Sequence, residues 1–423
     1  MLSFFLKKIK SQRGDLLLLS AKLSTPLLGL IGGLVAARFL APEELGVTQA
    51  IMLIPTYLGI LQLGVFSGLS RNLPLFRAKG DPEQAQRLVD ASGMAARWIG
   101  GIGAFLGVLS VIVFFFRADN SLFPLVSIAL IPLLLFNPLQ LHLSAVHRGM
   151  LSFESVGKSL HAQNIWNLVS SLSTAFWGVW GMVLKMAGSN FVVWLGLRRS
   201  VPLEANASAN WSDVRVLSKI GLPVMISGVV FGWMSVADRT IIASFLTAED
   251  LGYFALAGIV ASAVNVFPMS INMLLYPRIA GAFGASGSSR SLRRFVWIGL
   301  GLNMAVMLPF ALLAWYLIPI AVKALLPAYT AGIPAAQVVA LGAVFQFHSG
   351  SSAIIPALRK NWVPTVVGVV SVGLIWVAGI LAIQLDYGIV GVAVARVGVT
   401  ALYSAVLLGF VFFVTRRDIQ CED

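Results

Sequence analysis

Twelve apolar segments long enough to cross a membrane recur along this chain, and no other feature constrains its fold so strongly. A transmembrane helix needs about 20 consecutive, mostly apolar residues. The segments that meet this requirement are residues 16–40, 47–69, 94–116, 121–145, 159–176, 179–197, 219–245, 252–276, 295–318, 333–357, 363–385 and 387–414. Charged residues make up only 11% of the 423 residues, against about 25% in soluble domains. We therefore expect an all-α integral membrane protein with about twelve transmembrane helices.

The Lys and Arg residues lie mainly on one side of this predicted membrane. The N-terminal segment, the C-terminus and every second loop hold most of the 30 basic residues, while the alternate loops hold mainly acids such as Glu43, Glu249 and Asp386. Basic loops remain in the cytoplasm. We therefore expect both termini of this multi-pass membrane protein to be cytoplasmic. Because topology accounts for the net charge of +13, we expect no nucleic-acid partner.

A short motif occurs twice, about half a chain length apart. ARFLAPEELG spans residues 37–46 and ASFLTAEDLG spans residues 243–252. Each copy ends the first helix of a half, and its acidic pair would cap the next helix at the positive end of the helix dipole. Its glycine, Gly46 or Gly252, would let that helix start tightly. We assign this motif a structural role.

A second pair of motifs supports an internal repeat. GVWG at 178–181 and GIVG at 388–391 begin the sixth and twelfth predicted spans. Six helices return the chain to the side where it started, so the halves, residues 1–205 and 206–423, would run parallel in the membrane. Parallel repeats of this kind are typical of transporters, which bind their substrate where the repeats meet.

Little of the chain lies outside the predicted spans. Residues 81–83, Asp-Pro-Glu, combine an N-cap, a first-turn proline and a first-turn acid, which predicts a short cytoplasmic surface helix ending near Asp90. Residues 210–213 predict a similar start before the seventh span. Within the spans, glycines spaced four apart, such as Gly64 and Gly68, would let helices approach closely.

The sequence lacks the residue patterns of a cofactor, metal or catalytic site. The four histidines have no metal-ligand spacing; they are His142, His147, His161 and His348. The single cysteine, Cys421, excludes a disulfide within the chain and a cysteine-based metal site. Gly157-Lys158-Ser159 resembles the end of a phosphate-binding loop, but Ser152 stands where that motif needs glycine. We therefore expect no cofactor, no metal ion and no enzymatic activity.

Ionisable side chains within the predicted spans are the main functional signal, because a charge in hydrocarbon is costly. The candidate substrate-binding residues are Lys22, Arg71, Lys185, Asp238, Arg239 and Arg396. Lys22, Lys185 and Arg396 lie too deep to reach the interface easily, which favours a water-filled cavity. Arg71 and Arg239 are also placed to extend to the interface. Asp238, the only clear intramembrane acid, is also placed to neutralise a nearby cation, Arg38 or Arg239.

The sign of these charges indicates the charge of the ligand. A cation-coupled exporter of cationic drugs needs buried acids to hold protons, sodium or substrate. Lys and Arg instead bind phosphate, Lys as a point charge and Arg as a bidentate fork. The basic set therefore predicts a cavity that binds an anion.

Several segments resemble a known family. The two duplicated turns, residues 237–242, LGYFALA at 251–257 and LPAYTAGIP at 326–334 are similar to segments of the Wzx-like polysaccharide flippases. These are membrane proteins of the multidrug/oligosaccharidyl-lipid/polysaccharide exporter superfamily. The resemblance covers the whole chain in span count and repeat. It implies two six-helix lobes around a central cavity and transport by alternating access.

The resemblance also implies a substrate. It implies that a polyprenyl-pyrophosphate-linked oligosaccharide moves from the inner to the outer leaflet for assembly of a surface polysaccharide, such as an exopolysaccharide or O-antigen. Cationic cavity residues have no fixed position in this family, so only the charge logic carries over; the matching candidates are Lys22, Lys185 and Arg396. Membrane lipid is an expected partner, and a polysaccharide polymerase or other assembly protein is a candidate partner.

Two alternatives stay open. A cation-coupled multidrug or small-metabolite antiporter of the same fold would require a carboxylate for coupling. A membrane-embedded polymer-synthesis enzyme would require an outward-facing acid, such as Asp119 or Asp386.

Overall fold

The structure, a computed structural model, consists of helices joined by short connections. It describes residues 2–117, 120–200, 210–286, 289–346, 354–357, 360 and 362–417. Every regular element in these ranges is a helix. The chain forms two compact units: unit 1 comprises Met1–Leu40 and Ile54–Val229, and unit 2 comprises Ala41–Leu53 and Val230–Asp423. The chain passes from one unit to the other inside two helices. One boundary, between Leu53 and Ile54, lies in α2 (Pro42–Leu58), and the other, between Val229 and Val230, lies in α10 (Trp211–Phe245).

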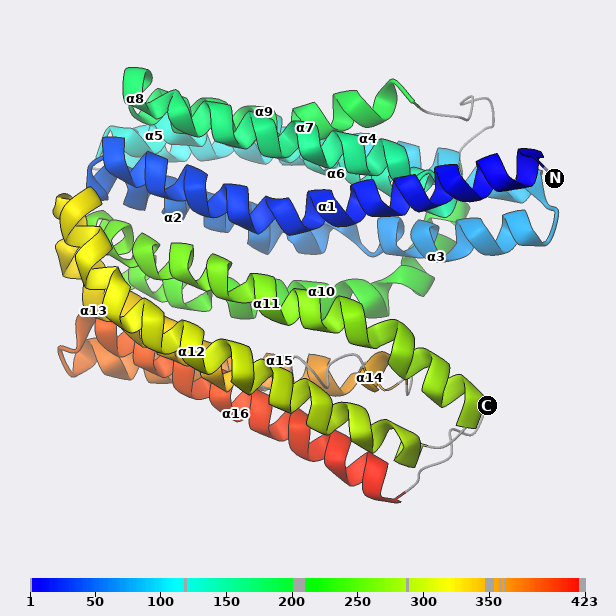
Figure 1. Cartoon of the computed structure of the whole chain (residues 1–423). Helices are drawn as coiled ribbons and strands as arrows, with labels where there is room; N and C mark the ends of the chain where they lie inside the picture. Colours follow the sequence, from blue (N-terminus) through cyan, green and yellow to red (C-terminus); the bar gives the residue numbers. More distant parts are fainter. Residues whose placement is uncertain are drawn as a thin grey trace. The chain divides into compact units, whose positions relative to one another are not determined.

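Unit 1 is a bundle of long helices with short segments at its turns (Figure 1). Its elements, apart from its parts of α2 and α10, are α1 (Leu2–Phe39), η1 (Gly59–Gln62), α3 (Val65–Ala78), α4 (Pro82–Arg117), α5 (Leu122–Ser127), α6 (Leu130–Gly149), α7 (Phe153–Leu172), α8 (Thr174–Trp177) and α9 (Val179–Arg198). Helix α1 packs along α7, α9 packs on both α6 and α7, and α4 packs on α6. The polar helix α7 is therefore covered by α1 and α9.

Unit 2 is a second helical bundle. Its elements, apart from its parts of α2 and α10, are α11 (Ala248–Ser286), η2 (Ser289–Leu292), α12 (Arg293–Leu325), η3 (Pro327–Gly332), α13 (Ile333–Gly342), η4 (Ala343–Phe345), α14 (Ile354–Ala357), α15 (Trp362–Gln384) and α16 (Gly388–Arg417). Helix α13 packs on α11, α12 and α16, and α15 packs along α16. The short helix α13 is thus central to its unit.

The helices have the length and composition of membrane spans. In the described part of the chain, ten helical segments are long and apolar enough to cross a membrane. Helices α7 and α11, which are 20 and 39 residues long, cover the two remaining predicted spans. The predicted all-α membrane protein is therefore confirmed.

The predicted second span, residues 47–69, is interrupted. Leu63 and Gly64 adopt positive φ angles of 48° and 77°, which separate η1 from α3. A Cβ atom at Gly64 would lie 2.4 Å from the backbone nitrogen of Leu222, and one at Gly68 would lie 2.1 Å from the carbonyl oxygen of Leu217. The glycine pair therefore allows close backbone contact with α10, as the spacing predicted, and the left-handed turn at Gly64 breaks the helix. The prediction of one continuous helix here was wrong.

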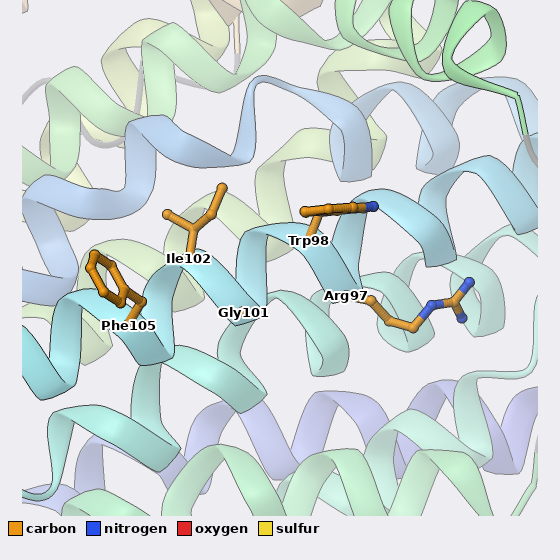
Figure 2. A pocket seen from close by; sticks show the side chains of 5 residues that line it. All are labelled: Arg97, Trp98, Gly101, Ile102 and Phe105. Carbon is orange, nitrogen blue, oxygen red and sulfur yellow. The ribbon is translucent and has the colours of Figure 1, made fainter.

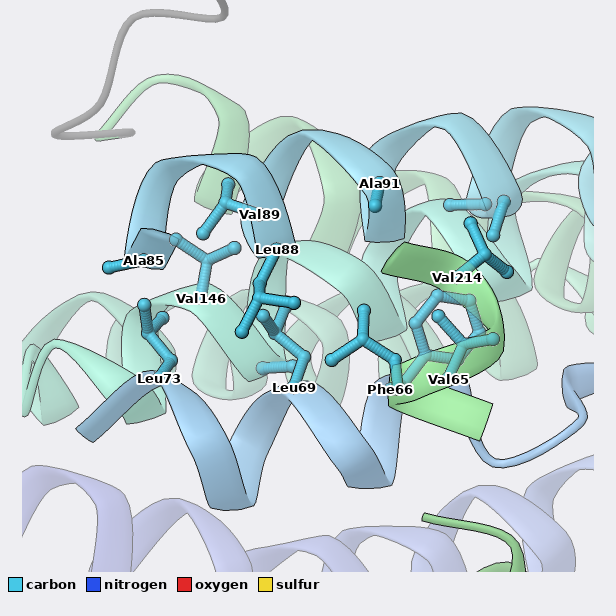
Figure 3. Packing of buried hydrophobic residues seen from close by; sticks show 14 residues of the cluster. Val65, Phe66, Leu69, Leu73, Ala85, Leu88, Val89, Ala91, Val146 and Val214 are labelled. Carbon is cyan, nitrogen blue, oxygen red and sulfur yellow. The ribbon is translucent and has the colours of Figure 1, made fainter. Parts of the chain in front are cut away.

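The predicted surface helix that would end near Asp90 is also wrong. The expected N-cap is present, because Asp81 Oδ1 accepts a hydrogen bond of 2.9 Å from the backbone N–H of Gln84. However, α4 continues without a break to Arg117. Its first turn is exposed, but one face is buried from Ala85 onward: Leu88 is fully covered and packs with Leu69 and Leu73 of α3 (Figure 3). The helix continues because nothing in Ala-Ser-Gly at 91–93 stops it and because these small residues fit closely into the bundle.

Two further predicted segments differ from the helices in the structure. Asn210 Oδ1 accepts a 3.2 Å hydrogen bond from the N–H of Ser212, but the helix that starts there is the full α10. The predicted tenth span, residues 333–357, is not one helix, because α13 ends at Gly342 and η4 follows. A Cβ at Gly342 would lie 2.5 Å from Val397 Cγ2, so this glycine permits a close contact with α16.

The duplicated turns form equivalent caps. Glu44 Oε2 accepts a 2.8 Å hydrogen bond from the N–H of Ala41, and Asp250 Oδ2 accepts one of 3.1 Å from the N–H of Thr247. These bonds to the helix start are those of a capping box. The acidic pair therefore has the structural role that the sequence predicted.

The glycines of these turns have a different role from the one expected. Neither Gly46 nor Gly252 has a positive φ angle. Instead, a Cβ at Gly46 would lie 1.7 Å from the carbonyl oxygen of Ala248, and a Cβ at Gly252 would lie 1.8 Å from that of Pro42. The two turns pack backbone against backbone within unit 2, and the glycines are needed for that contact rather than for the helix start.

The second pair of repeated motifs does use positive φ angles. Gly178, before α9, has a φ of 52°, and Gly388, at the start of α16, has a φ of 53°. An L-residue rarely adopts this conformation. The sixth and twelfth predicted spans thus start with the same backbone geometry.

Candidate functional site

A buried ion pair joins two helices of unit 2. Asp238 of α10 is fully buried, and its Oδ2 forms a salt bridge with Nη1 of Arg396 of α16. Its Oδ1 accepts a 2.8 Å hydrogen bond from the backbone N–H of Arg239. A carboxylate can remain ionised in such a place only if it is paired and hydrogen-bonded. The pair is separated by 158 residues in the chain, and it differs from the pairing with Arg38 or the Arg239 side chain that the sequence suggested.

Apolar packing surrounds this ion pair. Ala237, Ile241 and Ile242 of α10 and Val392 and Ala393 of α16 all belong to one buried cluster. Ala237 is directly before Asp238, and Ala393 lies one turn before Arg396. The surrounding side chains exclude water, so the Coulomb attraction of the pair acts in a low-dielectric environment.

Arg239 brings a second positive charge to the same place. Its side chain is half-buried, and its Nε is buried without a hydrogen-bond partner among the described residues. A Cβ at Gly258 of α11 would lie 3.2 Å from Arg239 Nη2, so the guanidinium lies against a helix position that carries no side chain. Asp238 balances one of the two arginines, and the group retains one net positive charge.

Unit 1 holds a buried cation with a different partner. Lys185 of α9 donates a hydrogen bond of 2.9 Å from Nζ to the hydroxyl of Ser171 of α7. Ser171 in turn donates a 2.7 Å bond to the carbonyl oxygen of Asn167. Lys185 forms no ion pair with any described carboxylate. The ammonium group has three donors, so it has capacity for further acceptors.

Two polar atoms near Lys185 have no hydrogen-bond partner among the described residues. Asn167 Oδ1 and Trp166 Nε1 are both buried and unpartnered. Asn167 lies one helical turn before Ser171, and the Trp166 ring lies against Gly188 of α9, where a Cβ would come within 2.2 Å of it. Buried polar atoms of this kind usually have a partner. The junction of α7 and α9 therefore offers a cation, an amide oxygen and an indole N–H to a ligand or to water.

A polar seam fixes α1 against α7. Asn164, which is buried, donates hydrogen bonds of 3.1 Å to the carbonyl oxygen of Ala21 and to Ser24 Oγ, and its Oδ1 accepts a 3.1 Å bond from Thr25. The amide is thus bonded at both ends, which sets the register of the two helices. Lys22 follows Ala21 and is exposed.

The predicted site residues therefore lie in separate places. Asp238, Arg239 and Arg396 are brought together in unit 2. Within unit 1, Lys185 lies between α7 and α9, Lys22 is on an uncovered part of α1, and Arg71 is exposed on α3. Nothing in the structure brings these three into contact with one another.

Sequence reasoning missed the uncharged polar side chains that bond Lys185 or lie along α1 and α9. Ser171, Asn167 and Asn164 all lie on α7, which is rich in Ser, Asn, Gln and His. A helix of that composition between two apolar ones was the signal that could have indicated a polar interior. Each described histidine forms a hydrogen bond with a different residue. His142 bonds Ser92, His147 bonds the carbonyl oxygen of Leu197, and His161 bonds Ser20.

Comparison with solved structures identifies the fold. A multidrug resistance MATE family transporter of the MOP superfamily, in an inward-facing conformation, matches with a TM-score of 0.71 at 14% identity, covering 94% of this chain and 98% of that one. The lipid II flippase MurJ, in an inward closed conformation, matches with a TM-score of 0.71 at 15% identity, covering 95% and 87%. A MOP superfamily transporter from Pyrococcus furiosus, whose binding pocket is described as having reverse polarity, matches with a TM-score of 0.60 at 13% identity, covering 96% and 95%.

Comparison of sequences identifies the family. No curated protein sequence matches the chain. The sequence profile of the family described as polysaccharide biosynthesis protein matches residues 35–329. That range is well over half of the chain, and it includes both copies of the duplicated turn. The resemblance predicted from these turns is confirmed, and the protein belongs to this polysaccharide biosynthesis family; its fold is similar to that of the solved transporters described above.

Proposed function

We propose that this protein is a flippase that moves a polyprenyl-pyrophosphate-linked oligosaccharide from the inner to the outer leaflet of the bacterial cytoplasmic membrane by alternating access. The observation that carries the proposal is the sign of the charges within the helices. Asp238 is the only carboxylate in the predicted spans, and Arg396 holds it in an ion pair. Lys185 and Arg239 form no ion pair with a described carboxylate, so the excess charge is positive and suits an anionic ligand.

The chemistry of the substrate explains why such charges are useful. A pyrophosphate-sugar head group cannot cross hydrocarbon unaided, because its charges and hydroxyl groups would lose their hydrogen-bond partners. Lys185 supplies ammonium donors, and Asn167 Oδ1 and Trp166 Nε1 add a buried acceptor and donor that suit sugar hydroxyls. The polyprenyl tail can remain in the lipid while the head group passes.

The membrane potential supplies a driving force. With the inside negative, outward movement of an anion gains about 2.3 kcal/mol per charge per 100 mV. A pyrophosphodiester with two charges gains about 4.6 kcal/mol at 100 mV on the same basis. We infer that this potential, together with consumption of the product outside, drives transport without ATP.

The two alternatives make different demands on the structure. An antiporter coupled to protons or sodium through an intramembrane acid would have to use Asp238, and Arg396 already neutralises it. A polymer-synthesis enzyme would need an outward acid. Asp386 is exposed in the turn before α16, with a φ of 58°, and Asp119 lies outside the described residues. Neither alternative has an observation in its favour.

The remaining features of the proposal concern orientation and partners. The charge distribution along the chain supports the proposal that both termini are cytoplasmic. The parallel halves 1–205 and 206–423 are the proposed lobes, and Lys22, Arg71, Lys185, Asp238, Arg239 and Arg396 are the proposed cavity residues. A polymerase or another assembly protein would receive the flipped oligosaccharide outside. The proposal needs no cofactor.

The proposal is tested by head-group translocation in sealed vesicles. Purified protein is reconstituted with a labelled polyprenyl-pyrophosphate oligosaccharide, and exposure of the label on the far side is timed for wild type, Lys185→Gln and Lys22→Gln. We expect transport by the wild type and slower transport by Lys185→Gln. Lys158→Gln is the control, because Lys158 is exposed and only pairs with Glu154 on the helix surface.

The outcome separates the functions. Folded wild-type protein that translocates no lipid-linked saccharide, but drives drug efflux in response to a proton or sodium gradient, would contradict the flippase and support the antiporter. Transport that is unchanged when the membrane potential is collapsed would contradict the proposed driving force. Normal transport by Lys22→Gln would remove Lys22 from the proposed binding residues and leave the flippase in place.

A further inference from the structure

A groove lies along one face of α4 in unit 1. It has a volume of about 440 Å³ and is lined by Arg97, Trp98, Gly101, Ile102 and Phe105 (Figure 2). This spacing places all five residues on one side of a helix. Gly101 provides the hollow, because a Cβ at this position would meet nothing within 4 Å. The volume lies in the range of small-ligand pockets.

The groove is polar at one end and apolar at the other. Figure 2 shows the Arg97 side chain extending away from Phe105, toward the N-terminal end of α4, and the Trp98 ring nitrogen turned the same way. The guanidinium lies near Gly93, one turn earlier, since a Cβ there would lie 3.9 Å from Arg97 Nη1. Ile102 and Phe105 extend the groove in the opposite direction. Arg97 and Phe105 are separated by about 12 Å of helix.

The polar end lies where the sequence places the cytoplasmic surface of the membrane. Arg97 and Trp98 are near the start of the predicted span 94–116, on the basic side of the chain. The ring of Trp211, the first residue of α10, lies 6.4 Å from that of Trp98. Trp and Arg are typical of the membrane interface, where one end of the side chain is apolar and the other is wet.

Both parts of the groove are open to a ligand. Trp98 is 60% exposed and Phe105 is 67% exposed. Arg97 is exposed as well and forms no ion pair with any described carboxylate. The Arg97 guanidinium lies at the interface, and the apolar part of the groove is about as long as the hydrocarbon depth of one leaflet. Together they match a molecule with a phosphate at one end and a hydrocarbon chain at the other.

We propose that this groove binds one anionic phospholipid of the cytoplasmic leaflet. Arg97 pairs with the phosphate, and the indole N–H of Trp98 donates a hydrogen bond to the head-group region. One acyl chain lies over Gly101 and contacts Ile102 and Phe105. The site is separate from the cations of the proposed transport path, and the proposal does not rest on the flippase function.

The test is native mass spectrometry of the purified full-length protein, titrated with phosphatidylglycerol and, separately, with phosphatidylcholine. We expect one phosphatidylglycerol to be retained in preference to phosphatidylcholine. Arg97→Gln should weaken phosphatidylglycerol binding about tenfold, a loss of about 1.4 kcal/mol, and weaken phosphatidylcholine binding less, because its choline group offsets the phosphate charge. Phe105→Ala should weaken both lipids.

The same helix offers matched controls. Arg117 is an exposed arginine at the other end of α4, and Phe115 is 70% exposed, close to the value for Phe105. Arg117→Gln and Phe115→Ala should leave retention unchanged. Equal losses for Arg97→Gln and Arg117→Gln would overturn the proposal, because lipid would then respond only to total surface charge.

Two other results would also overturn the proposal. One is equal retention of phosphatidylglycerol and phosphatidylcholine by the wild type. The other is displacement of phosphatidylglycerol by a polyprenyl phosphate at a much lower concentration, because the groove would then be a site for the transported lipid. Head-group translocation by the same variants is measured in parallel. Loss of the lipid preference with normal translocation supports a separate lipid site, and the transport assay of wild-type protein tests the flippase independently.

Discussion

Lys185 and Arg396 lie at similar depths, seven and eight residues after Gly178 and Gly388, yet they meet different partners. Arg396 forms a salt bridge with the fully buried Asp238. Lys185 donates a hydrogen bond to the neutral hydroxyl of Ser171. The backbone starts of both helices are nearly identical, with φ angles of 53° and 52°. Two helices that begin similarly therefore hold different cations. The one in unit 2 is paired with a carboxylate, and the one in unit 1 has no described carboxylate as a partner.

This difference separates a structural role from a binding role. A cation held by a buried carboxylate contributes to stability and is not free to bind a passing anion. A cation held by a hydroxyl keeps its charge uncompensated, and a phosphate can compensate it. In unit 2, the side chain of Arg239 supplies the uncompensated positive charge, because Asp238 is already paired with Arg396. We expect substitutions in the two units to change different measured quantities.

The largest expected effect is on the stability of unit 2. Arg396→Gln leaves Asp238 buried without its cation, and removing one partner of a buried pair costs about 3–5 kcal/mol. Equilibrium unfolding in mixed micelles measures this loss. The control is the double variant Asp238→Asn with Arg396→Gln, which removes both charges and should recover most of the stability. A double variant as unstable as the single one would show that the pair is not the source of the effect.

The next effect concerns transport rather than stability. Lys185→Gln should slow head-group translocation by about tenfold or more, since a charged hydrogen bond contributes about 1.5–3 kcal/mol. The free energy of unfolding should change by only about 1 kcal/mol. Lys185→Arg should retain most of the transport because it retains the charge. If Lys185→Gln instead unfolded the protein as strongly as Arg396→Gln, the two cations would share a structural role and the comparison would fail.

The similarity of the two helix starts can be tested at Gly178 and Gly388. Gly178→Ala and Gly388→Ala place an L-residue at a positive φ angle, which costs about 1–2 kcal/mol. No atom lies within 4 Å of a Cβ at either position, so backbone strain is the only cost. Unfolding of each variant should show equal losses. Unequal losses would indicate that the two helix starts are not equivalent, and the comparison of Lys185 with Arg396 would lose its basis.

The smallest effect is expected at the duplicated caps. Glu44→Ala and Asp250→Ala each remove the side-chain acceptor of a capping box, worth about 0.5–2 kcal/mol at a helix start. Glu43→Ala is a matched control for the first cap, because Glu43 is the neighbouring acid in the same first turn. Thermal unfolding should rank Glu44→Ala and Asp250→Ala together and Glu43→Ala below them. A larger loss for Glu43→Ala would contradict the assignment of Glu44 as the cap.

The sequence was sufficient for the all-α membrane fold, because that depends on local composition. The apolar segments set the spans, and the motifs at 178–181 and 388–391 located two helix starts of equal geometry. The sequence was less informative about continuity. Gly64 lies at the break before α3 and Gly342 is the last residue of α13, whereas Gly93 lies inside an unbroken helix, and only the surrounding packing distinguishes them.

The site was predicted in part for a related reason. All six candidate residues could be chosen by depth alone, since an ionisable group in a span is conspicuous. Their partners could not be chosen, because the pairing of Asp238 with Arg396 joins residues 158 positions apart. Ser171 carries no charge and is one of several hydroxyl-bearing residues on α7, so its contact with Lys185 required the packing of α7 on α9.

The contact between the duplicated turns has a consequence for how such a chain is assembled. Gly46 meets the carbonyl of Ala248, and Gly252 meets the carbonyl of Pro42. Pro42 and Ala248 occupy the same position of the motif, so each copy contacts the other with the same surface. A self-complementary contact of this type is what closes a symmetric dimer. Joining both copies in one polypeptide makes that association intramolecular, and it also lets the two copies mutate separately, so that the two halves can carry different ionisable residues.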